Sequence, residues 1–180
     1  GGSVRMNAGA YGSEIKDILQ RVTALDKKGN LIDLSVSELK YSYRHSDLKK
    51  DLIYIGGYFK GSPAAAIKIA ERMTVIRQER EFTQPVKMPT GGSTFVNPPG
   101  YKAWELIDAA GCRGLMRGGA IVSEKHCNFL INTGSASSAD LEGLGEEVRR
   151  RVFEGCGIKL DWEIQRLGVG PQNISWELSA

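Results

Sequence analysis

Apolar and polar positions alternate along the first part of the chain in the pattern of β-strands. Residues 20–36 contain two such runs, separated by the turn-forming sequence Lys27-Lys28-Gly29-Asn30, and this arrangement predicts a hairpin. Residues 51–61 are rich in β-branched and aromatic side chains and predict another strand. Within that strand, Gly56-Gly57 indicates a bulge or the close approach of another group.

The next apolar residues follow a helical period. Ser62 is suited to the N-cap and Pro63 to the first helical position, so residues 62–80 predict a long amphipathic helix. Its apolar face is formed by Ala66, Ile69, Ala70, Met73 and Ile76. Residues 81–101 then hold four of the six prolines and three glycines, which predicts irregular structure and a boundary between two lobes near residue 90.

Helices and strands are mixed in the remainder of the chain. Residues 102–111 predict a short helix that ends at Gly111, and two apolar runs predict strands over 118–123 and 128–134. Residues 137–157 predict a helix with the apolar face Leu141, Leu144, Val148 and Val152, begun by a capping box of Ser137 and Asp140. Residues 160–168 alternate as a last strand, and the whole pattern predicts an α+β fold.

Composition agrees with a folded protein. Of the 180 residues 41% are apolar and 25% charged, and the net charge of +3 is too small to imply a polyanionic partner. No apolar run approaches the roughly 20 residues that cross a bilayer, and no signal peptide precedes Gly1, so we expect a cytoplasmic protein. Cys112, Cys127 and Cys156 are expected as reduced, buried thiols, and with only two histidines no metal site is expected.

Six motifs in order carry a resemblance over nearly the whole chain. They are GGSVRMNAGAYG at the start, YSYRHS, Arg80 with Gln84-Pro85, GGSTFVNPPG, GGAIVSEKHCNFLINTG and WEIQRLG. Together they resemble the UDP-N-acetylenolpyruvoylglucosamine reductase (MurB) family of peptidoglycan synthesis, in its shorter, type II form. The resemblance implies a C-terminal portion without the N-terminal FAD lobe: residues 1–89 as the later half of the FAD-binding lobe, 90–160 as the substrate-binding lobe, and 161–180 as a returning tail.

The family chemistry implies three catalytic residues. NADPH reduces FAD, and the flavin then delivers hydride to the β-carbon of the enolpyruvyl ether, which gives UDP-N-acetylmuramate. Arg44 matches the arginine that pairs with the substrate carboxylate, Ser93 the proton donor to the α-carbon, and Glu163 the glutamate that orients the reacting group. Without the resemblance, these residues would be interpreted as a solvated arginine, a turn serine and a surface carboxylate on a strand.

Further matches imply binding roles. Tyr43, Arg80, Asn97 and His126 match positions near the nucleotide or its diphosphate, although His126 equally fits a hydrogen-bonded core residue. The positions that match backbone lying against the flavin are Gly1, Gly2, Asn7, Gly9 and Ala10. Four residues depart from the usual family pattern and leave the fine substrate contacts open: Val96, Trp104, Arg117 and Gln165.

These matches leave two hypotheses about the chain. It is either a piece of an FAD- and NADPH-dependent reductase, inactive by itself, or a non-catalytic fragment that binds a UDP-sugar without flavin. A nucleic-acid-binding module is disfavoured because the basic cluster in YSYRHSDLKK is short and unrepeated. The intact enzyme is expected to be a monomer without nucleic-acid or membrane partners.

Overall fold

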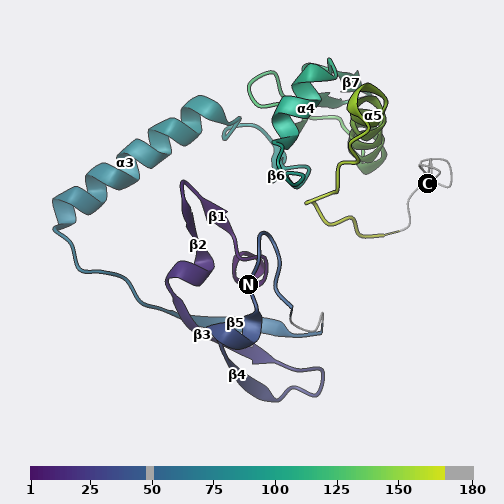
Figure 1. Cartoon of the computed structure of the whole chain (residues 1–180). Coiled ribbons are helices and arrows are strands. Elements are labelled where there is room, and N and C mark those ends of the chain that lie inside the picture. The colour runs from purple at the N-terminus through teal and green to yellow at the C-terminus, as the bar shows by residue number, and fades with distance from the viewer. Residues whose placement is uncertain (48–50, 169–180) are drawn as a thin grey trace. The chain divides into compact units, whose positions relative to one another are not determined.

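The computed structural model describes residues 1–47 and 51–168 (Figure 1). The chain divides into two compact units, Gly1–Ile76 and Arg77–Ala180. The division falls within helix α3 (Ala66–Thr83), ahead of the proline-rich stretch. The expected lobe boundary near residue 90 therefore stays a prediction.

The first unit is built around a three-stranded antiparallel sheet. Its order is β4 (Leu31–Ser35), β3 (Leu19–Leu25) and β5 (Ile53–Phe59). The predicted hairpin is confirmed: the Asp26 carboxylate accepts hydrogen bonds from the backbone N–H groups of Lys28 (2.8 Å) and Asn30 (2.9 Å), which closes the turn. Short elements complete the unit: α1 (Gly2–Arg5), β1 (Gly9–Ala10), β2 (Ser13–Glu14), the 3₁₀ helix η1 (Ile15–Asp17) and α2 (Val36–Leu39).

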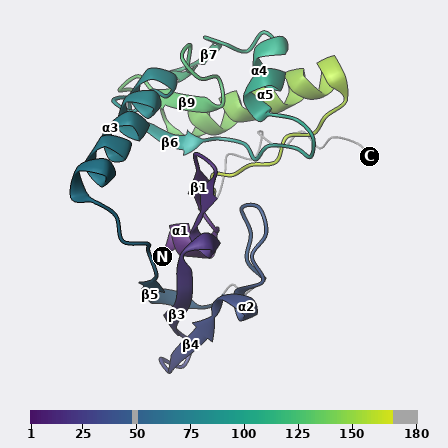
Figure 2. The same cartoon turned by 60° about the vertical axis from the view of Figure 1, so that its left-hand side comes forward.

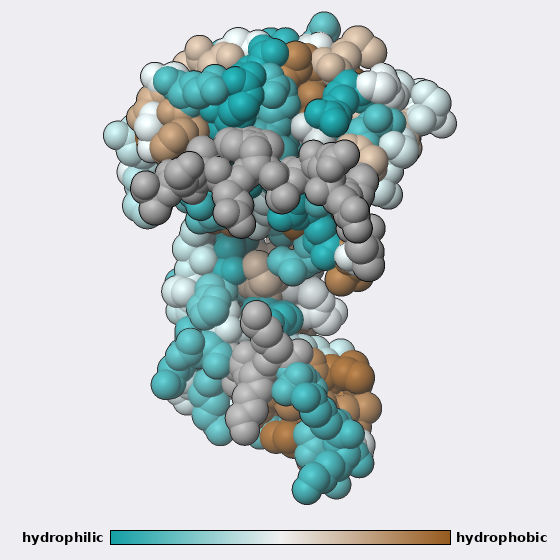
Figure 3. All heavy atoms as spheres, turned by 90° about the vertical axis from the view of Figure 1, so that its right-hand side faces the viewer, coloured by the Kyte–Doolittle hydropathy of each residue, from teal (hydrophilic) through white to brown (hydrophobic). Residues whose placement is uncertain are grey.

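The predicted irregularity in β5 is also present. Thr23 pairs with Gly56 and Ala24 with Tyr54, so Ile55 is an extra residue in β5, next to the first glycine. Leu19, Val22 and Leu39 form the buried core of this unit. Other apolar side chains of the sheet face outward, with 69% exposure at Leu31 and 65% at Ile53. Figure 3 shows apolar atoms gathered on the surface of this unit, at the bottom of the view.

The second unit packs two helices on a four-stranded antiparallel sheet (Figure 2). The sheet has the order β6 (Thr90–Ser93), β9 (Phe129–Asn132), β8 (Ala120–Val122) and β7 (Met116–Arg117). Helices α4 (Ala103–Ala109) and α5 (Ser138–Cys156) contact each other, and α5 contacts three of the strands. The core between them includes Phe95, Ile107, Val122, Leu144, Val148 and Leu160.

Helix α5 follows its sequence signals closely. The Ser137 hydroxyl accepts from the Asp140 N–H at 3.1 Å, and the Asp140 carboxylate accepts from the Ser137 N–H at 2.9 Å, so the predicted capping box is confirmed. Gly157 ends the helix in the left-handed conformation, with φ of 71°. Gly111 follows α4 in the same way, with φ of 66°.

Four expectations differ from the structure. Helix α3 begins at Ala66 instead of residue 62, and none of its described residues is buried, although its apolar spacing predicted a packed face. Residues 160–168 make a single β-bridge, Phe95 with Trp162, instead of a strand, because only one residue pair comes into register. Cys112 and Cys127 are buried free thiols as expected, but Cys156 is exposed in the last turn of α5.

In the part of the chain that the structure describes, no helix is both long and apolar enough to cross a membrane.

Candidate functional site

Asn7 joins three segments of the first unit. Its buried side-chain amide donates to the Glu14 carboxylate (3.1 Å) and to the Ser42 carbonyl (3.2 Å). Its side-chain oxygen accepts from the Lys16 N–H at 3.0 Å. The predicted role of Asn7 beside the flavin therefore rests on its backbone, since the side chain is engaged within the protein.

Gly9 and Arg44, both predicted site residues, are directly bonded. The Arg44 guanidinium donates to the Gly9 carbonyl at 2.9 Å, and it lies 5.1 Å from the centre of the Tyr43 ring. A Cβ on Gly9 would lie 2.7 Å from Glu14 Cγ, so the close approach of β1 to β2 requires glycine here. The structure thus brings the predicted carboxylate-binding arginine to the predicted flavin-side segment.

Arg44 lies in a tight turn, and its charge acts on the nearby carboxylate of Glu14. Ser42 and His45 exchange backbone hydrogen bonds of 3.1 and 3.3 Å, and Arg44 adopts φ of 54°, in the left-handed region. The pKa of Glu14 lies below its usual value, chiefly because Lys16 donates a hydrogen bond to it, and the Arg44 charge acts in the same sense. Gly1, Gly2 and Ala10 are exposed at the start of this unit.

Ser93 ends strand β6 in the second unit. It is half-buried and pairs with Phe129 of β9, and Gly92 before it has φ of 89°. The ladder shifts register between Thr90 and Ser93, so the two intervening glycines lie outside regular pairing. This irregularity separates Ser93 from the regular part of the strand.

Glu163 lies on a segment bonded to the one that follows Ser93. The Glu163 N–H donates to the Thr94 carbonyl at 2.8 Å, and the Val96 N–H donates to the Asp161 carbonyl at 2.9 Å. We call these two stretches, 94–96 and 161–163, the paired strips. They bring two of the three predicted catalytic residues, Ser93 and Glu163, to adjoining segments of one unit.

Trp162 anchors the second strip to helix α5. Its ring centre lies 5.0 Å from that of Phe95, and its indole N–H donates to the Glu146 carboxylate at 2.9 Å. A Cβ on Gly145 would lie 2.0 Å from the Trp162 ring, so the helix needs glycine at this contact. Sequence reasoning missed this anchor, although Gly143 and Gly145 within the predicted helix were the available signal.

Asn97 and His126 both have structural contacts. The Asn97 side-chain oxygen accepts from the Ala103 N–H at 2.9 Å, which caps the first turn of α4. His126 lies between Trp104 and Phe129, and its Nδ1 accepts from the Asn128 N–H at 3.4 Å. Burial lowers the pKa of His126, so its imidazole is neutral at pH 7. Their roles in binding substrate stay predictions.

Arg80 lines a cavity of about 550 Å³. Arg77 and Gly91-Gly92 contribute to the same wall, and the Arg80 Nε–H donates to the Gln84 side-chain oxygen at 3.2 Å. Two guanidinium groups beside exposed backbone favour an anionic ligand, although the nearby Glu81 offsets one of the charges. Sequence reasoning did not single out Arg77.

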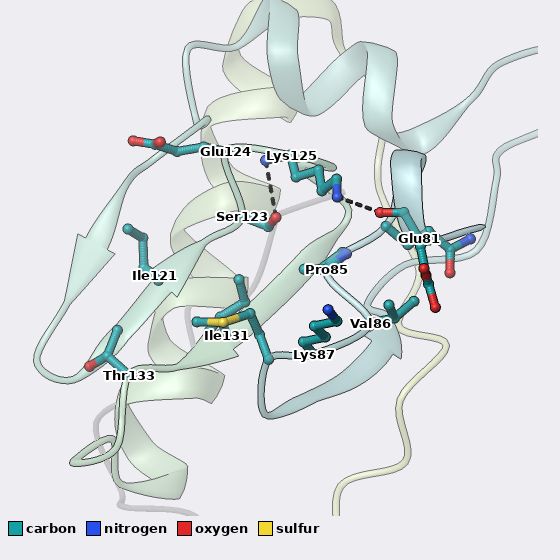
Figure 4. Close-up of a pocket in the computed structure, with 12 residues that line it drawn as sticks. Glu81, Pro85, Val86, Lys87, Ile121, Ser123, Glu124, Lys125, Ile131 and Thr133 are labelled. Carbon is teal, nitrogen blue, oxygen red and sulfur yellow. Dashed lines mark hydrogen bonds between the residues drawn. The ribbon is translucent and has the colours of Figure 1, made fainter. Parts of the chain in front are cut away.

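A second cavity lies where the 84–88 loop meets β8 and β9 (Figure 4). It measures about 620 Å³ and has a largely aliphatic wall that includes Val86, Ile121 and Ile131. At its edge the Lys125 ammonium donates to the Glu81 carbonyl. This bond ties the last turns of α3, which carry Arg80, to the loop before β9.

The departures from the family pattern occupy ordinary structural positions. Arg117 lies against α5, where a Cβ on Gly143 would be 2.5 Å from its guanidinium carbon. The Trp104 carbonyl accepts a hydrogen bond from the Cys127 thiol, Val96 is half-buried in the paired strips, and Gln165 is exposed. Among the residues described, no group of three metal-binding side chains is present.

Comparison with known proteins first defines the class of the second unit. Residues 84–167 match the family model "UDP-N-acetylenolpyruvoylglucosamine reductase, C-terminal domain", so this α+β unit is a reductase C-terminal domain. Over the part of the protein that it spans, the chain belongs to the UDP-N-acetylenolpyruvoylglucosamine reductase family.

Named relatives agree with this assignment. Reductases of this name from Paramagnetospirillum magneticum and Sphingopyxis alaskensis are each 57% identical over 94% and 93% of the chain. The chain spans about half the length of these relatives, 55% and 56%. The crystal structure of the reductase (MurB) from Thermus caldophilus matches 91% of this chain and 59% of that one, with a TM-score of 0.77 and 36% identity.

Proposed function

We propose that this chain is the part of a UDP-N-acetylenolpyruvoylglucosamine reductase that carries Arg44, Ser93 and Glu163 as catalytic residues. The enzyme would reduce UDP-N-acetylglucosamine enolpyruvate to UDP-N-acetylmuramate with NADPH and FAD, a step of peptidoglycan precursor synthesis. The hydrogen bond between the Glu163 N–H and the Thr94 carbonyl carries the proposal, because it sets the predicted glutamate beside the predicted proton donor. The similarity to named reductases supports the same conclusion.

Each residue has a defined task in this proposal. When bound and reduced by NADPH, FAD would supply the hydride that adds to the β-carbon of the enolpyruvyl group. The Arg44 fork pairs with the substrate carboxylate and stabilises the negative charge that develops there. Ser93 transfers its hydroxyl proton to the α-carbon, and Glu163 orients the reacting group.

The first unit has a feature that fits an anionic cofactor. Arg5 Nη1 is buried and has no hydrogen-bond partner among the described residues. A buried cationic donor without a partner is costly, so a ligand with phosphate groups such as FAD would relieve that cost. Gly2 supports this assignment, because a Cβ there would meet no atom within 4 Å, which leaves its backbone accessible.

The arginine-lined cavity would receive the substrate diphosphate. Arg80 is the predicted diphosphate ligand, and Gly91-Gly92 in the same wall lead directly into Ser93. Phosphate bound there would place the remainder of the substrate near the proton donor. Arg44 belongs to the other unit and is assigned to the substrate carboxylate by its motif alone.

Separating the two half-reactions tests the proposal. In the full-length enzyme that contains this chain, Ser93→Ala should abolish oxidation of the reduced flavin by the enolpyruvyl substrate and leave flavin reduction by NADPH intact. Stopped-flow flavin absorbance measures both steps, and Ser135→Ala, at an exposed serine of the same unit, is the control. Loss of both half-reactions in Ser93→Ala would refute the proton-donor role.

A second candidate function is a non-catalytic UDP-sugar-binding fragment without flavin. It is favoured by one observation: every residue that lines the arginine cavity belongs to the second unit. Calorimetry of the 180-residue chain with UDP-N-acetylglucosamine should then give heat that Arg80→Ala abolishes. Absence of heat with the unchanged chain would leave this candidate without support.

A further inference from the structure

We propose that Asn128 is a positioning residue that fixes Ser93 relative to Glu163. The inference rests on the proposed function and adds to it a residue outside the predicted site. Asn128 directly precedes Phe129, the β9 residue that pairs with Ser93. It therefore lies beside the end of β6, where the strand continues into the paired strips.

Asn128 bonds the first strip through its backbone and its side chain. The Asn128 carbonyl accepts from the Thr94 N–H at 2.8 Å. Its side-chain oxygen accepts from the Phe95 N–H at 3.0 Å, and its side-chain amide donates to the Phe95 carbonyl at 2.9 Å. The side chain thus supplies both bonds that a neighbouring strand would make to residue 95.

Burial makes these bonds costly to lose. Asn128 is only 4% exposed, and Phe95 and Thr94 are 1% and 0% exposed. A buried backbone group that loses its partner costs about 1–3 kcal/mol, so truncation of the Asn128 side chain would leave two such groups at residue 95. The strip would shift to recover partners or water.

In the described part of the chain, the first strip (residues 94–96) makes no side-chain hydrogen bond that could replace the two from Asn128. The Thr94 hydroxyl is fully buried and makes no hydrogen bond within the described part of the chain. On its other side the first strip bonds to residues 161–164, the segment that carries Glu163. Asn128 on one side and this segment on the other therefore define where residues 93 and 163 lie.

The test compares variants of the full-length, FAD-loaded enzyme. Asn128→Ala should slow oxidation of reduced flavin by the enolpyruvyl substrate about 10- to 100-fold, the size of effect that a misplaced catalytic group produces. Flavin reduction by NADPH and the substrate Kd, read from flavin absorbance, should change less than about twofold. Asn128→Ser keeps a neutral polar group but is too short to bond both the N–H and the carbonyl of Phe95, so it should slow the same step.

Asn132 provides the matched control. It ends the same strand, and its side-chain oxygen accepts from the N–H groups of Gly134 (2.8 Å) and Ala136 (3.0 Å), which are not part of the paired strips. Asn132→Ala should lower the melting temperature but leave flavin oxidation unchanged. An unchanged rate in Asn128→Ala, or an equal slowing in Asn132→Ala, would overturn the positioning role.

If Asn128→Ala does not fold, Asn128→Ser carries the test, and a wild-type rate in that folded variant overturns the proposal. If the unchanged enzyme does not pass electrons from reduced flavin to the enolpyruvyl substrate, the proposed function fails instead. The wild-type measurement therefore separates the two.

Discussion

At the scale of single residues, Gly145 has the sharpest steric requirement in helix α5. Gly145→Ala would place a Cβ 2.0 Å from the Trp162 ring, which the Glu146 hydrogen bond and Phe95 hold in place. We expect a loss of about 2 kcal/mol in the free energy of unfolding, typical of overpacking in a well-packed core. Urea denaturation followed by circular dichroism measures it.

Gly155 in the same helix is the control. A Cβ there meets no atom within 4 Å, so Gly155→Ala should stabilise the protein by about 0.5–1 kcal/mol through helix propensity alone. If both variants shift stability in the same direction, the Trp162 contact does not restrict position 145.

Glu147 links stability to pH. Hydrogen bonding by Arg150, together with Arg151, lowers the pKa of Glu147 from 4.5 to about 2. Because the folded-state pKa is depressed, the contribution is fully present above pH 4.5 and is lost as the pH falls through about 2. Glu147→Gln should cost under about 1 kcal/mol at pH 7, since the pair is partly exposed.

The check on Glu147 is urea unfolding across that pH range. The difference between Glu147→Gln and the unchanged protein should shrink between pH 4.5 and about 2. Glu105→Gln, at an exposed carboxylate 3.6 Å from Lys102, is the matched control. A difference for Glu147→Gln that is constant over this range would contradict the assignment.

At the scale of elements, local sequence signals were enough for the hairpin, β5 and both helices of the second unit. Turn residues, caps and glycine stops act within a few positions, so residues such as Asp26, Ser137 and Gly157 could be recognised without any tertiary contact. The motifs likewise led to Ser93 and Glu163, but no local pattern indicated that their segments adjoin. That follows from long-range bonds such as the one between Thr94 and Glu163.

The errors share one physical cause. A strand over 160–168 would need a ladder of partners, and only Trp162 finds one. The apolar spacing of α3 predicted burial, but Ile69 and Met73 remain 47% and 66% exposed, because amphipathic spacing does not say what covers the face. Asn128 was missed for the same reason: a buried amide is recognisable only from its distant partner, Phe95.

The capping box of α5 gives the prediction at this scale. Ser137→Ala removes the hydroxyl that accepts from the Asp140 N–H, and we expect a loss of about 1 kcal/mol in the free energy of unfolding. Thermal denaturation measures it, with Ser135→Ala, two residues before the cap, as the control. Equal melting temperatures for Ser137→Ala and the control would show that the cap contributes no stability.

At the scale of the whole molecule, two units with separate cores raise the question of which functions each supports alone. The arginine-lined cavity, Ser93, Asn128 and Glu163 all belong to the second unit, whereas Arg44 and the predicted flavin-side segment belong to the first. We therefore expect that substrate affinity and cofactor affinity can be changed independently of each other. The chain also spans about half the length of its relatives, 55% of the reductase from Paramagnetospirillum magneticum.

This separation predicts the behaviour of the 180-residue chain purified by itself. Arg5 and Gly9 are proposed to provide one group of contacts for a flavin, and the remaining contacts would come from the part of the relatives that the chain does not span. We expect a colourless protein that does not oxidise NADPH with the enolpyruvyl substrate. Visible absorbance and an NADPH oxidation assay measure this, with the full-length enzyme as the positive control. A stoichiometric flavin absorbance band in the purified chain would contradict the expectation and show that these contacts suffice to hold FAD.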